Sequence, residues 1–254
     1  MNPYSNTYSE QHTVQSFMVD GKLKLTPTFM FNLMQEVAVN HVANVGIGWD
    51  YLHERGHFWA LSRMDVEILR RPQWHEQIEI ATWGKKHNYL VQPRDHQITT
   101  PTGEVLVNAT ANWVILDMEG KPVQLDQYEP LLLNNHERHA IEKPASRLRQ
   151  TVNDVESTFH PVVYTNIDMN RHANNSAYVT WVMDSFDNAF HRAHELAFLS
   201  INYLQQMHAD DRYAVHKKLN TIRMTKSIKN FAFCKLYGVF EVVYIGFIYI
   251  YSIP

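Results

Sequence analysis

The sequence of 254 residues has very little cysteine: a single one, Cys234. One thiol cannot form a disulfide within the chain, which excludes a small secreted domain held by disulfides and favours a reducing compartment. Cys234 follows the apolar residue Phe233 and has no partner base near it in the sequence. A thiolate nucleophile at this position is therefore not expected.

Other signatures are also missing. The chain has no G-x-S-x-G motif and no glycine-rich phosphate loop, which excludes serine-elbow hydrolases and P-loop proteins. It has no clear apolar run of about 20 residues, so we expect no membrane span. A net charge of −3 gives no general attraction to nucleic acid or to an anionic membrane. The opening MNPYSNTYSEQHTVQSF lacks the regions of a signal peptide, and we expect a cytoplasmic protein.

The 15 histidines do not form a metal-binding pattern. His53 and His57 lie four residues apart in HERGH, but a glycine stands directly before the second histidine, which does not suit the helical metalloprotease motif. The segment DMNRH begins like a calcium loop. However, Ala173 replaces the turn glycine and Val179 replaces the bidentate glutamate. We therefore expect no metal and no other cofactor.

Hydrophobic spacing in the first half predicts one helix followed by strands. The segment 26–46 has apolar residues at helical spacing, begins with Thr-Pro and ends at a glycine. Four strands are predicted from alternating segments at 57–69, at 76–84 and, with a turn around Pro101–Gly103, at 89–123.

The second half repeats this order. A strand candidate at 159–169 is followed by a helix at 174–193 and a strand at 195–207. A helix followed by strands, found twice, predicts a duplicated α+β unit. The predicted divisions are a first domain at 1–123, a polar connector at 124–158, a second domain at 159–216 and a basic, apolar tail at 217–254.

Asp168, Asn170 and His172 stand at alternate positions in TNIDMNRHANNSAYVTW, just before the second predicted helix. In an extended segment they would face one side and bring together an anion, an amide and an imidazole. Such a set suits activation of water or orientation of a carbonyl group. The same segment also suits a polar turn in which Asn174 or Asn175 caps the helix. The spacing alone leaves both interpretations open.

Two segments resemble one protein family. DMNRHANNSAYVTWVMDS is similar to the D-x-N-x-H-x-N-N-x-x-Y-x-x-W segment of the acyl-acyl carrier protein thioesterases, which are plant plastid enzymes with bacterial relatives. FWALSRMDVEILRRPQWHEQIEIATW resembles that family's aromatic residue, L-S-R-M, P-x-W turn and strand ending in T-W. RDHQI stands where the family has Arg-Asp and then an aromatic or apolar residue. The resemblance begins near residue 10 and ends near residue 216.

The resemblance implies an α+β architecture of tandem hotdog folds, each a long central helix wrapped by an antiparallel sheet. It implies hydrolysis of the thioester between a fatty acyl chain and the phosphopantetheine arm of acyl carrier protein, with no metal or cofactor. It also implies a monomer, as a pseudo-dimer of two hotdogs, or a homodimer. An acyl-CoA thioesterase is the alternative, because hotdog proteins serve both carriers.

By resemblance, the catalytic set is Asp168, Asn170 and His172. Asp168 or His172 would activate water, or Asp168 would attack directly, while Asn170 would hold the carbonyl group or the water. Asn174 and Asn175 would support the loop and cap the helix. The candidates to line an acyl pocket in the first hotdog are Phe29, Leu33, Val37 and Trp59, and those to meet the acidic carrier protein are Arg70, Arg71, Lys85 and Lys86.

Two features depart from the family. Gln206 stands at the position of a family glutamate and Met207 at that of a cysteine found in many plant members, so a cysteine mechanism is excluded. Gln206 can orient water but cannot take its proton. The tail at 217–254 is unlike the family, from which we expect a loss of reading frame near residues 216–218 and an incomplete second sheet. These departures leave open an acyl-binding protein with impaired catalysis.

Overall fold

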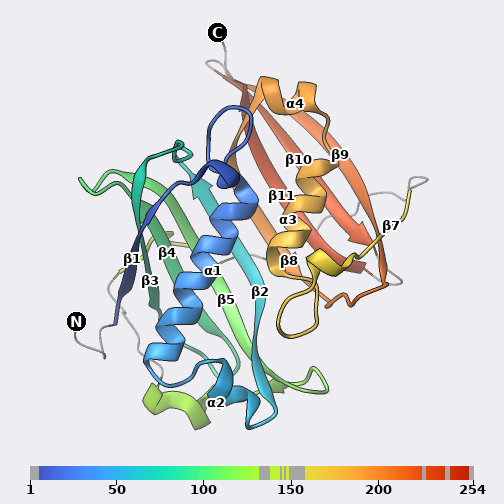
Figure 1. Cartoon of the computed structure of the whole chain (residues 1–254). Coiled ribbons are helices and arrows are strands. Elements are labelled where there is room, and N and C mark those ends of the chain that lie inside the picture. Colours follow the sequence, from blue (N-terminus) through green and yellow to red (C-terminus); the bar gives the residue numbers. More distant parts are fainter. Residues whose placement is uncertain are drawn as a thin grey trace. The chain divides into compact units, whose positions relative to one another are not determined.

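The computed structural model describes most of the chain (Figure 1). The described residues are 6–131, 138–143, 145, 147–148, 158–224, 227–237 and 241–251. The chain forms two compact units, residues 1–145 and 146–254, and the boundary lies inside the predicted connector. Each unit combines helices with an antiparallel sheet, as the α+β prediction requires.

The first unit contains the predicted long helix as α1 (Pro27–Asn44). Thr26 caps its N-terminus by accepting a hydrogen bond from the backbone N–H of Phe29 at 3.3 Å, and Pro27 occupies the first turn, where its missing N–H costs nothing. The buried face of α1 consists of Pro27, Met30, Phe31, Met34, Val37, Ala38 and His41. Figure 1 shows α1 lying across one face of the sheet. A short second helix, α2 (Trp49–His53), lies outside the predicted elements.

The sheet of the first unit is antiparallel, with the order β1–β3–β4–β5–β2, and β6 pairs with β5. Its strands are β1 (Tyr8–Thr13), β2 (His57–Ile68), β3 (Gln77–Gly84), β4 (Gln92–Thr99), β5 (Val105–Asp117) and β6 (Pro122–Val123). β2 to β5 confirm the four predicted strands. In β3, the alternating residues Ile78, Ile80 and Thr82 are all buried, which is why periodicity alone identified this strand.

The start of the predicted connector belongs to the core of the first unit. The 3₁₀ helix η2 (Leu125–Leu131) buries Leu125 and Tyr128 in a cluster with Ile47, Leu52 and Ile115. The hydroxyl of Tyr128 also lies 2.6 Å from Nδ1 of His57. The predicted surface connector is therefore wrong for this stretch, because two apolar side chains anchor an otherwise polar segment.

The second unit divides the predicted helix 174–193 into α3 (Asn175–Asp184) and α4 (Asn188–Ala193). The break lies at Asp187, whose carboxylate accepts a hydrogen bond from the N–H of Phe190 at 2.7 Å and so starts a new helix. The predicted strand at 159–169 is also wrong for most of its length. Within it, the strand β7 covers His160–Pro161 alone, and the 3₁₀ turn η3 (Tyr164–Asn166) follows it.

The sheet of the second unit is antiparallel, with the order β8–β11–β10–β9–β7. Its long strands are β8 (His194–Tyr203), β9 (Arg212–Met224), β10 (Ser227–Tyr237) and β11 (Glu241–Tyr251). The structure thus differs from the expected incomplete sheet: β11 is composed mainly of Val, Ile, Tyr and Phe, which favour strands, and it pairs with β8 and β10. β8 ends at Tyr203, so Gln206 and Met207 lie outside it, although the predicted strand at 195–207 included both residues.

Candidate active site

The D-x-N-x-H segment forms a tight loop between η3 and α3, here called the Asp–His loop (residues 167–173). Ile167 and Ala173 pair across its base, and the backbone N–H of Asp168 donates to the C=O of His172 at 2.8 Å. Arg171 has a φ of 64°, a left-handed conformation that reverses the chain. Of the two interpretations that the spacing left open, the segment adopts the turn and not the extended conformation.

The carboxylate of Asp168 holds this loop together. Its Oδ1 accepts hydrogen bonds from the backbone N–H groups of Asn170 at 2.8 Å and of His172 at 3.3 Å. The negative charge of Asp168 also acts on the His172 imidazole and favours its protonated form. The polar turn is therefore the means by which an acid and an imidazole come together.

The two asparagines after the loop start α3. The Asn174 side chain is the N-cap, and its Oδ1 accepts from both the backbone N–H and the hydroxyl of Ser176 at 3.0 Å. Asn175 is the first residue of the helix, and its C=O accepts a hydrogen bond from the hydroxyl of Tyr203 at 2.9 Å. These contacts fix where α3 begins, directly after the Asp–His loop, as we expected of the two residues.

The imidazole of His172 is half-buried and contacts the ring of His208, with the ring centroids 4.8 Å apart and the planes at 75°. Burial, and next the neighbouring His208, lower the pKa of His172, while the charge of Asp168 opposes this shift. The imidazole is therefore neutral at neutral pH and can accept a proton. No local pattern marks His208 in the sequence, because it lies in the loop after β8, far from the motif along the chain.

The loop between β8 and β9 is bound to the Asp–His loop. The backbone N–H of Met207 donates to the hydroxyl of Tyr178 at 3.1 Å, and its C=O accepts from the N–H of Ala173 at 2.7 Å. Met207 is buried, whereas its neighbour Gln206 is half-buried. Because Ala173 directly follows His172, the stretch around Gln206 runs beside the candidate catalytic residues.

The histidines of HERGH do not share a helix. His53 is the last residue of α2, Gly56 has a φ of 69°, and His57 is the first residue of β2. Across the described residues, no group of three or more His, Cys, Asp or Glu side chains is placed to hold a metal ion.

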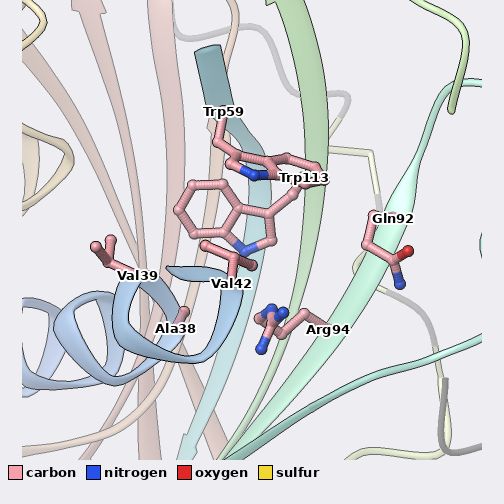
Figure 2. A pocket seen from close by; sticks show the side chains of 7 residues that line it. All are labelled: Ala38, Val39, Val42, Trp59, Gln92, Arg94 and Trp113. Atoms are coloured by element: carbon pink, nitrogen blue, oxygen red, sulfur yellow. The ribbon is translucent and has the colours of Figure 1, made fainter. Parts of the chain in front are cut away.

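The first unit contains a pocket beside α1, with about 320 Å³ of empty space that is partly open to solvent (Figure 2). It is lined by Ala38, Val39 and Val42 of α1, Trp59 of β2, Gln92 and Arg94 of β4, and Trp113 of β5. Among the predicted acyl-pocket residues, Trp59 lines this pocket, but Phe29, Leu33 and Val37 do not. They lie earlier on α1, where Val37 is part of the buried core and Phe29 contacts the ring of Phe17.

One wall of this pocket carries a buried cation. Nη1 of Arg94 lies 3.1 Å from the hydroxyl of Thr82 and 2.9 Å from Nδ1 of His41, which must accept because a guanidinium only donates. Burial lowers the pKa of Arg94 to about 10, so the side chain is still charged at neutral pH. The adjacent Asp95 pairs with Nζ of Lys85 at 3.3 Å. The surface of the pocket is therefore mainly apolar, and the guanidinium of Arg94 is buried against His41 and Thr82.

The basic residues proposed to meet a carrier protein are mostly engaged within the unit. Arg70 contacts Glu76 at 2.8 Å and Glu104 at 3.2 Å, and Arg71 contacts Asp20 at 2.7 Å. Lys85 pairs with Asp95, as described above, whereas Lys86 is exposed. An acidic partner would have to compete with these internal carboxylates, so Lys86 is the more available of the four.

The sequence matches two models of one family. The acyl-ACP thioesterase N-terminal domain matches residues 5–126, and the acyl-ACP thioesterase C-terminal domain matches residues 149–234. The chain belongs to the acyl-ACP thioesterase family. The second match continues past residue 216, where we expected the resemblance to end, so a loss of frame near residues 216–218 is not supported.

Relatives extend the comparison. The oleoyl-acyl carrier protein thioesterase 2 of Arabidopsis thaliana, a chloroplastic protein, is 30% identical over 224 residues, which cover 81% of this chain and 61% of that protein. The chain thus spans about three fifths of the length of this relative.

Two solved structures have the same fold. The 12:0-ACP thioesterase from Umbellularia californica superposes with a TM-score of 0.83 at 19% identity, covering 97% of this chain and 94% of that one. An acyl-ACP thioesterase from Bacteroides thetaiotaomicron has a TM-score of 0.79 at 20% identity, covering 98% of this chain and 100% of that one. At these identities the likeness shows the fold, which confirms the predicted hotdog architecture.

No helix among the described residues is both long and apolar enough to cross a membrane.

Proposed function

We propose that this protein hydrolyses the thioester between a fatty acyl chain and the phosphopantetheine arm of acyl carrier protein, and releases the free fatty acid. The observation that carries the proposal is the Asp–His loop, where the Asp168 carboxylate binds the backbone of His172 and acts electrostatically on its neutral imidazole, within the segment that matches the family. The similarity to the oleoyl-acyl carrier protein thioesterase 2 of Arabidopsis thaliana supports the same substrate class. The cytoplasmic location and the monomer or homodimer remain predictions from the sequence.

The geometry of the loop suggests how the reaction proceeds. The neutral His172 accepts a proton as a water molecule attacks the carbonyl carbon of the thioester. The oxyanion that develops lies near the start of α3, where the helix dipole and its N–H groups provide positive potential. The carbon–sulfur bond then breaks, and the proton returns to the sulfur, which yields a fatty acid and a thiol. Asn170 is the candidate to hold the carbonyl group or the water.

Asp168 fits an orienting role better than direct attack. Its Oδ1 already accepts two backbone hydrogen bonds, which stabilise the carboxylate and reduce its nucleophilicity. The same charge stabilises the imidazolium that forms on His172 during the reaction. We therefore assign the activation of water to His172. Asp168 is assigned the orientation and electrostatic support of His172.

The pocket of the first unit is the candidate site for the acyl chain. Ala38, Val42 and Trp59 offer an apolar wall, and burying each CH₂ group of a chain against such a surface contributes about 0.8 kcal/mol. The acyl-pocket candidates on α1 are therefore no longer Phe29, Leu33 and Val37 but residues about one turn further along the helix. Trp59 stays a candidate.

The test is the release of free thiol from acyl-acyl carrier proteins of several chain lengths, with the matching acyl-CoA esters measured in parallel. We expect the carrier-protein esters to react faster. His172→Gln should lower kcat by about 100-fold or more, because general-base catalysis contributes roughly 10²–10⁴-fold. The exposed His139 offers a matched control, and His139→Gln should retain the wild-type rate.

The other outcomes are equally informative. A preference for the CoA esters would assign the alternative carrier. A folded wild-type protein that binds fatty acyl chains but releases no thiol would refute the hydrolase and identify an acyl-binding protein.

A further inference from the structure

A second imidazole is held against the Asp–His loop by a turn after β8. The backbone N–H of His208 donates to Oδ2 of Asp211 at 2.7 Å, and the N–H of Asp211 donates back to the C=O of His208 at 3.3 Å. Asp210 has a φ of 70° within this turn. Val162 anchors the turn, since its N–H donates to the C=O of Asp211 at 2.7 Å. The contact between the rings of His208 and His172 is thus supported by a fixed backbone.

The neighbouring groups are poorly suited to hold the proton of the attacking water. Gln206 is an amide and cannot accept it at neutral pH. Asp168 is committed to two backbone N–H groups within its own loop. His172 can accept the proton, but its half-buried position makes the charged form costly. His208 is exposed and therefore in contact with solvent water.

We propose that His208 is a second acid–base residue of the hydrolysis, and that the attacking water is activated between the imidazoles of His172 and His208. This inference rests on the proposed thioesterase function. The water oxygen bonds to the carbonyl carbon while His172 accepts one of its protons, which it shares with His208. The carbon–sulfur bond breaks, and that proton returns to the departing sulfur. The products are a fatty acid and the pantetheine thiol, and no other reactant is consumed.

The position of Gln206 gives this inference its sharpest consequence. Gln206 is an amide, and two residues further the chain has an imidazole that contacts His172. His208 thus provides a proton acceptor that the amide cannot provide. Introducing a carboxylate through Gln206→Glu should therefore compensate for the loss of His208.

The experiment measures kcat and KM for an acyl-acyl carrier protein in four proteins: wild type, His139→Gln, His208→Gln, and His208→Gln combined with Gln206→Glu. We expect kcat of His208→Gln to fall by about 10-fold or more with little change in KM, as for a lost acid–base group. Free imidazole in the buffer should restore part of this rate, and so should the added Gln206→Glu. His139→Gln should match the wild type.

Three results would overturn the inference. The first is a wild-type kcat in His208→Gln. The second is a reduced kcat that neither imidazole nor Gln206→Glu restores, since this would show that His208 only supports the structure. The third is a wild-type protein that releases no thiol, which would refute the proposed function itself and is recognised before any variant is compared.

Discussion

The buried histidine of β4 makes acid sensitivity the most direct prediction from the structure. His96 is 1% exposed. Burial, followed by electrostatic interactions with Arg94 and His41, lowers the pKa of His96 to about 3. Its imidazole therefore stays neutral in the folded protein, whereas in the unfolded chain it titrates near pH 6.5.

The sign and size of the effect follow from proton linkage. Between pH 6.5 and pH 3 the unfolded chain binds a proton that the folded chain does not, so the free energy of unfolding falls as the pH falls. The slope approaches about 1.4 kcal/mol per pH unit for one group. His96 alone should therefore cost the first unit about 2 kcal/mol of stability between pH 7 and pH 5, and nothing above that range.

The perturbation is His96→Leu, which replaces the ring with an apolar side chain of similar volume. Nδ1 of His96 has no hydrogen-bond partner among the described residues, so the loss of this atom leaves no donor or acceptor unsatisfied. At pH 8 we expect a change of about 1 kcal/mol or less. At pH 5 the variant should have gained about 2 kcal/mol relative to the wild type.

Urea unfolding followed by tryptophan fluorescence measures this difference. Of the six tryptophans, only Trp181 lies in the second unit, so the signal reports mainly on the first. His139→Leu, at an exposed position, serves as the control and should follow the wild-type pH dependence. If His96→Leu and the wild type lose stability in parallel between pH 8 and pH 5, the reasoning about His96 is refuted.

Two further predictions concern the pocket and the start of α3. Val42→Phe should fill part of the pocket and shift thiol release toward shorter acyl chains. Leu33→Phe, on the same helix but outside the pocket lining, should leave the chain-length profile unchanged. An unchanged profile in both variants would exclude this pocket as the acyl site. Asn174→Ala removes the cap of α3 and should lower the stability of the start of this helix by about 1 kcal/mol. The measurement is amide hydrogen exchange, which should become faster in residues 170–178. Exchange equal to that of the wild type would show that the cap contributes nothing.

Local patterns predicted those parts of the fold that depend on neighbouring residues. Thr26 and Pro27 mark the start of α1, and alternation in 76–84 marks β3, because capping and strand burial act over a few positions. The break at Asp187 also depends on a local signal, the N-cap of α4, but the helical apolar spacing on both sides led us to predict one continuous helix. The turn at 164–166 was missed for a related reason: the Asn166 side chain accepts a hydrogen bond from the N–H of Val163, which competes with an extended chain.

The sheet of the second half differs from what its sequence predicted. The β9–β11 segments form a sheet with β8, although their composition led us to expect an incomplete one. The β11 segment, whose sequence is apolar at alternate and intervening positions alike, lacks the alternation by which a half-buried strand is recognised. Their pairing is decided by register with distant strands, which composition does not encode.

The sequence by itself determined the identity of the candidate catalytic residues and the family to which the chain belongs. Asp168, Asn170 and His172 are recognisable because their spacing and the following helix form one continuous segment. Only the tertiary structure decided that the segment is a turn, that His208 contacts His172, and that Arg94 shares a pocket with Trp59. Each of these three features depends on loops that bring segments distant in the sequence together. The geometry of these loops is set by packing and hydrogen bonds between the segments.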